Sequence, residues 1–131
     1  MKHFRVFLVL MLLVVATSVS AQSTFDKWPA VKEFHDVMSE TFHPAEEGNL
    51  APIKARSEEM MTKAAALLTA PKPTEFKTRA IAEASEKLKD KSSALHDLII
   101  AKGSDDAIVK SLTDMHDVFH EIVGLCSETK K

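Results

Sequence analysis

The chain has 131 residues, enough for one domain, and 45% of them are hydrophobic. Its 17 basic and 19 acidic residues give a formal net charge of −2, which disfavours a nucleic-acid-binding protein because such proteins need a clustered basic surface. The single cysteine, Cys126, excludes an intrachain disulfide framework, so packing must hold the core, and a homodimer linked through this thiol is one expected state.

The first 21 residues have the pattern of a secretory signal peptide. A short basic head precedes an apolar run over residues 6–16, and small residues follow this run. The run is shorter than the ~20 apolar residues that a membrane-spanning helix needs, which favours cleavage after Ala21 over an uncleaved anchor. We therefore expect an exported protein, periplasmic or secreted, whose mature domain spans residues 22–131 without stable membrane insertion.

Helical periodicity marks four segments of the mature chain, and no alternating run of β-branched residues predicts a strand. The first predicted helix covers about residues 26–42 and has Asp26 as its cap. His43 and Pro44 are expected to end it, because the residue before a proline is disfavoured in the α region. The second predicted helix covers about residues 50–69 and stops at a Pro-Lys-Pro segment.

The third predicted helix covers about residues 74–101, with Thr74 as its N-cap and Gly103 at the position after its C-cap. Ser104 is expected to cap the fourth helix, which extends to about Gly124. Four amphipathic helices of similar length with short links predict an all-α domain, an up-down-up-down antiparallel four-helix bundle.

The histidines of the mature chain are the candidate ligands for a metal ion. His116 and His120 are four residues apart on the fourth helix, so their imidazoles lie about 40° and ~6 Å apart and can chelate one ion. In an antiparallel arrangement His35 differs from His116 by only ~7 Å in height, which allows a site shared by the first and last helices. His96 is a further candidate from the third helix, at a lower level.

The ligand type indicates the ion. Imidazole suits zinc and copper, and the thioether of Met38 would favour Cu(I), although methionines at helical spacing are more often core residues. His43 lies near Glu46 and Glu47, where it either binds a cation or, as is more usual, caps the C-terminus of the first helix.

The sequence thus predicts an exported protein that binds copper or zinc through inward-facing histidines, for buffering or transport. The chain has no glycine-rich phosphate loop, no G-x-S-x-G elbow and no pair of carboxylates fixed by spacing, so we expect no enzymatic activity. The alternative is a non-catalytic interaction bundle, of a chaperone-like kind, whose histidines only pack. The predicted metal ligands are His35, His116, His120, Met38 and His96.

The layout and length of the mature chain, with the stretch MMTKAAALL over residues 60–68 before the Pro-Lys-Pro segment, resemble the periplasmic four-helix-bundle cytochromes, both the soluble b-type cytochrome and the c-prime group. The resemblance implies haem held by a histidine of the last helix, His116 or His120, and a methionine of the first, Met38. The chain has no Cys-x-x-Cys-His motif, so covalent haem attachment is excluded. What the resemblance leaves is a non-covalent haem in an electron-transfer protein.

Overall fold

The computed structural model describes residues 24–129, and this part of the chain is helical without strands. The predicted signal peptide lies outside the described residues. A short helical segment at residues 24–27 precedes the main elements. These are the long helices α2 (Pro29–Glu46), α3 (Ala51–Thr69), α4 (Arg79–Ile100) and α5 (Asp105–Glu128), together with the 3-10 turn η1 (Thr74–Phe76). The prediction of an all-α domain is confirmed.

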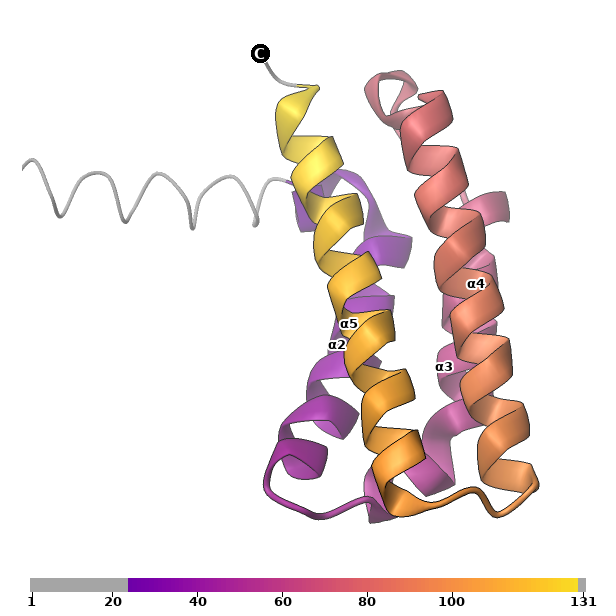
Figure 1. Cartoon of the computed structure of the whole chain (residues 1–131). Coiled ribbons are helices and arrows are strands. Elements are labelled where there is room, and N and C mark those ends of the chain that lie inside the picture. Colours follow the sequence, from indigo (N-terminus) through magenta and orange to yellow (C-terminus); the bar gives the residue numbers. More distant parts are fainter. Residues whose placement is uncertain (1–23, 130–131) are drawn as a thin grey trace, which may run out of the picture.

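The four long helices lie side by side and are joined by short links (Figure 1). Each packs against the next along the chain, and α5 returns to pack against α2, with the sparsest contact of the four. Among residues 24–129, no helix combines the length and apolar character that a membrane span requires.

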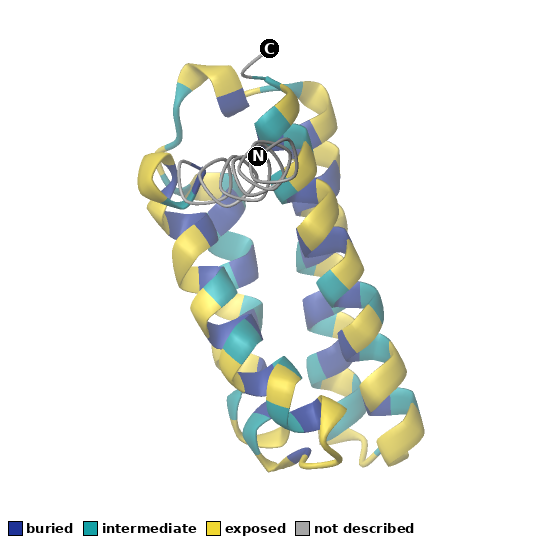
Figure 2. Cartoon of the chain, turned by 90° about the vertical axis from the view of Figure 1, so that its left-hand side faces the viewer, coloured by how far each residue is buried: buried dark blue, intermediate teal, exposed yellow. Residues whose placement is uncertain are grey.

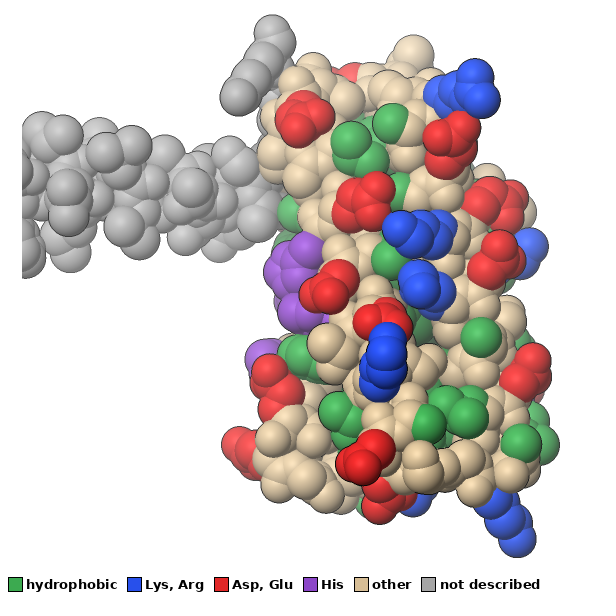
Figure 3. Space-filling model, viewed as in Figure 1, with side chains coloured by type: hydrophobic (Ala, Val, Ile, Leu, Met, Phe, Trp, Pro, Cys, Tyr) green, Lys and Arg blue, Asp and Glu red, His purple; other side chains and the backbone are tan. Residues whose placement is uncertain are grey.

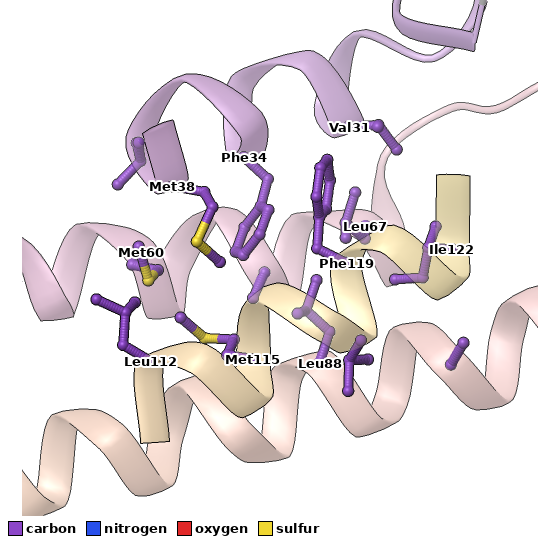
Figure 4. Packing of buried hydrophobic residues seen from close by; sticks show 14 of the residues in the cluster. Val31, Phe34, Met38, Met60, Leu67, Leu88, Leu112, Met115, Phe119 and Ile122 are labelled. Carbon is purple, nitrogen blue, oxygen red and sulfur yellow. The ribbon is translucent and has the colours of Figure 1, made fainter. Parts of the chain in front are cut away.

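The core lies between the helices, along the apolar stripe of each one. Figure 2 shows buried positions on the inner faces and exposed positions on the outer faces. Phe34 of α2 and Phe119 of α5 are almost fully buried, and their ring centroids lie 5.2 Å apart. Met38, Met60 and Met115 fill the space beside them (Figure 4). Each such side chain contributes about 1.5–3 kcal/mol through the burial of apolar surface, so this cluster holds α2 against α5.

The first long helix runs past its predicted end. It continues through Pro44 to Glu46, and it begins at Pro29 after Trp28 rather than after a capping Asp26. Pro44 stands in the last turn of the helix, and its carbonyl accepts hydrogen bonds from the N–H groups of Glu47 (3.1 Å) and Asn49 (2.9 Å). The preference against the α region before a proline was too weak to stop the helix.

The third long helix begins later than predicted. Thr74 opens the turn η1, and Thr78 caps α4 by accepting a hydrogen bond from the N–H of Ile81 at 3.2 Å. The turn carries Phe76 into the core, where its ring centroid lies 5.9 Å from that of Trp28. Burying this aromatic ring outweighs one more turn of exposed helix.

The position of the link between α4 and α5 was predicted correctly, but the residue that ends α4 differs from the prediction. Ser104 caps α5 as predicted, accepting a hydrogen bond from the N–H of Ala107 at 3.2 Å. Lys102, not Gly103, takes the left-handed position that ends α4, with φ of 59°. Helix α5 also continues beyond Gly124, because Cys126 extends its buried stripe.

Candidate metal centre

A small cavity of about 50 Å³ lies at the seam between α2 and α5. It receives four of the five histidines of the predicted mature chain, two from each helix. Figure 3 shows histidine side chains gathered at one edge of the molecule, on its surface. The residues that line the cavity are His35, Met38, Ser39, Phe42, His43, His116, Phe119 and His120.

His116 and His120 face each other within this cavity. Their Nε2 atoms lie 3.1 Å apart, and their ring planes are inclined by 74°. An ion bound at about 2.05 Å from both nitrogens would see them at an angle of roughly 100°, close to the tetrahedral value that zinc prefers. The separation of the two nitrogens, which is also within hydrogen-bond distance, therefore suits a two-histidine chelate, and one helix alone sets it through the spacing of four residues.

The surroundings of His116 pack against its ring and favour its neutral form. Phe42 stacks on the imidazole with ring centroids 4.0 Å apart and planes inclined by 7°. Burial lowers the pKa of His116, and the neighbouring His120 lowers it further, while Asp117 and Glu46 act in the opposite direction. A neutral imidazole keeps the lone pair that a metal ion needs, so these effects favour metal binding.

His35 lies beside the pair rather than against it. Its ring packs between Phe25, at 4.8 Å between centroids, and Phe119, at 5.8 Å. Its side chain remains 42% exposed, and His120 is exposed as well. The histidines therefore lie along the seam, on its outer side. Met38 lines the inner wall of the cavity and is buried in the core (Figure 4).

The structure does not bring His96 to this cavity. Its Nδ1 lies 2.9 Å from the hydroxyl oxygen of Ser57, across the interface between α4 and α3. Among residues 24–129, no group of three or more His, Cys, Asp or Glu side chains is already placed to hold a metal ion together. The described arrangement thus offers a preformed pair of donors.

His43 was expected at the end of the first helix, apart from the His116–His120 pair, but it lines the same cavity. Helix α2 continues through Pro44. A row therefore forms along one face of this helix, at successive spacings of four, from His35, Ser39 and His43. That spacing was visible in the sequence. His43 Nδ1 lies 3.4 Å from Glu46 Oε2, and both side chains are mainly exposed.

A haem does not fit this arrangement. Met38 and His116 do line the same cavity, as an axial pair would require, but the cavity holds about 50 Å³. Cofactor pockets usually enclose about 300 Å³ or more, and here the packed rings of Phe34 and Phe119 occupy the neighbouring space.

The chain matches no protein-family model, no curated protein and no solved structure.

Proposed function

We propose that this protein binds a transition-metal ion, copper or zinc, through His116 and His120. The observation that carries the proposal is the 3.1 Å separation of their Nε2 atoms, which matches two donors of one ion. Imidazole nitrogen is a suitable ligand for both metals. His35 and Met38 line the same cavity, and a thioether ligand would favour Cu(I).

The position of the pair at the surface supports exchange of the ion rather than permanent retention. Structural zinc sites are closed by four protein ligands, whereas open sites leave positions for water or another ligand. His120 is exposed, so a ligand from another molecule can reach the ion. This openness supports a role in metal buffering or transport.

The proposal includes the setting of the site. The helices would form an up-down-up-down antiparallel four-helix bundle, which the short links and the packing of chain neighbours support. The signal sequence would direct the protein to the periplasm or out of the cell, with cleavage after Ala21.

Elemental analysis of the mature protein, isolated from the compartment to which it is exported, tests the proposal. We expect bound copper or zinc, and we expect His116→Ala and His120→Ala to lose most of it. His96→Ala is the matched control, because His96 lies at another interface and should keep wild-type metal content. Unchanged metal content in both site variants would remove the site. A metal-free wild-type protein that stays metal-free on titration would favour the non-catalytic interaction bundle.

A further inference from the structure

The histidine pair supplies two nitrogens, but open zinc sites in proteins usually have three protein ligands and one water. The facing helix α2 can supply the missing third donor. Two histidines of α2 line the same cavity, His35 and His43. Their side chains lie at different heights along the seam.

Helix geometry favours His43. Side chains on a helix lean toward its N-terminus. Phe42 faces His116 across the seam, and His35 faces Phe119. A step toward the N-terminus of α2 is therefore a step along α5 from His116 toward its C-terminus. A side chain at His43 therefore leans toward the pair.

The same rule turns His35 away from the pair. Its ring is in contact with Phe25, on the N-terminal side of α2, at 4.8 Å between centroids. A second aromatic ring, that of Phe119, lies 5.8 Å from it between centroids. Moving the His35 ring to an ion would disturb these contacts, whereas the His43 side chain is 68% exposed and can rotate.

A carboxylate lies next to His43 on the same helix. His43 lines the same cavity as His116 and His120, and Glu46 stands three residues beyond it on α2. Glu46 Oε2 lies 3.4 Å from Nδ1 of His43. A carboxylate at Nδ1 fixes the tautomer that leaves Nε2 for a metal, an arrangement common among metal-bound histidines.

We propose that His43 is the third ligand of the site and that Glu46 is the carboxylate that orients it. The inference rests on the proposed function of His116 and His120 and extends it to a three-histidine site for a divalent ion such as Zn²⁺ or Cu²⁺. Rotation of the exposed His43 side chain, which the exposed Glu46 side chain of the same helix follows, completes the set, and one position stays open toward solvent. The bound ion then links α2 to α5.

Zinc and copper titrations of the full mature chain test this assignment. We expect His43→Ala to weaken Zn²⁺ binding more than tenfold, and Glu46→Gln to weaken it by about tenfold, in the range seen when outer carboxylates are removed. The matched control for the carboxylate is Glu47→Gln, which removes a neighbouring exposed carboxylate and should bind as the wild type does. His35→Ala removes the competing histidine of the cavity, and we expect it to weaken binding less than His43→Ala does. Electron paramagnetic resonance of the Cu²⁺ form should show three coordinated nitrogens, and two in His43→Ala.

The outcomes separate the inference from the proposed function. Wild-type affinity in His43→Ala, together with lost binding in His116→Ala, would overturn the third ligand and leave the pair in place. Weaker binding in His35→Ala but not in His43→Ala would assign the third position to His35 and also overturn the inference. Wild-type binding in both His116→Ala and His120→Ala would instead remove the site itself. Helical circular dichroism of each variant confirms that the substitution leaves the fold intact.

Discussion

Replacing Lys102 with glycine should stabilise the protein. Lys102 ends α4 with φ of 59°, a conformation in which glycine is usual because it has no Cβ. Two hydrogen bonds fix this conformation, from Lys102 N–H to the carbonyl of Ile99 (3.0 Å) and from Gly103 N–H to the carbonyl of Leu98 (2.9 Å). The left-handed region costs an L-residue about 1–2 kcal/mol, and the added freedom of glycine in the unfolded chain takes back about 0.5–1 kcal/mol. The expected gain for Lys102→Gly is therefore about 0.5–1 kcal/mol.

Urea unfolding and thermal melting measure this gain. For a domain of this size, 1 kcal/mol corresponds to a rise in Tm of about 4 °C. Lys102→Ala is the matched control: it removes the exposed amino group but keeps the Cβ, so its free energy of unfolding should stay near that of the wild type. If Lys102→Gly is no more stable than Lys102→Ala, the strain attributed to this residue is not there.

Three other substitutions test separate parts of the structure. Ser57→Ala removes the hydrogen bond to His96 and should lower the free energy of unfolding by about 1 kcal/mol, measured in urea, without changing metal affinity. Gly103→Ala would place a Cβ 2.3 Å from Leu98 Cδ1 and should destabilise by about 1–3 kcal/mol, an effect that Leu98→Ala in the same chain should reduce. In EDTA, the free energy of unfolding of the wild type should fall as the pH drops below about 6.5. Burial lowers the pKa of His116 in the folded protein, so the unfolded chain takes up the proton first. His116→Gln should show a smaller fall.

The middle of each helix could be predicted from the sequence, while several ends could not. Apolar residues at helical spacing define a stripe whatever the neighbouring helices do, so the cores of all four segments were correct. The ends depend on tertiary contacts that spacing does not reveal. Thr74 looked like a cap, but the gain from burying Phe76 against Trp28 diverts the chain into a 3-10 turn first.

The histidine pair could be predicted for the same reason as the helix centres. The spacing of His116 and His120 is a property of one helix, and their contact survives any rotation of α5 about its axis. The positions of His35 and His96 relative to the pair depend on how each helix is rotated. Counting heights along the seam placed His35 near the site, but heights could not reveal that His96 turns toward Ser57 instead.

The seam between α2 and α5 is the place where an ion would have the largest structural effect. It joins the first and last of the long helices, so an ion held by His43 and His116 would close the long chain segment between them, and clips that close long loops constrain the unfolded chain most. An ion held by His116 and His120 alone spans one turn of α5 and constrains little. The identity of the third ligand therefore decides whether the ion only occupies a surface site on α5 or also links α5 to α2, where the contact is the sparsest of the four described between the helices.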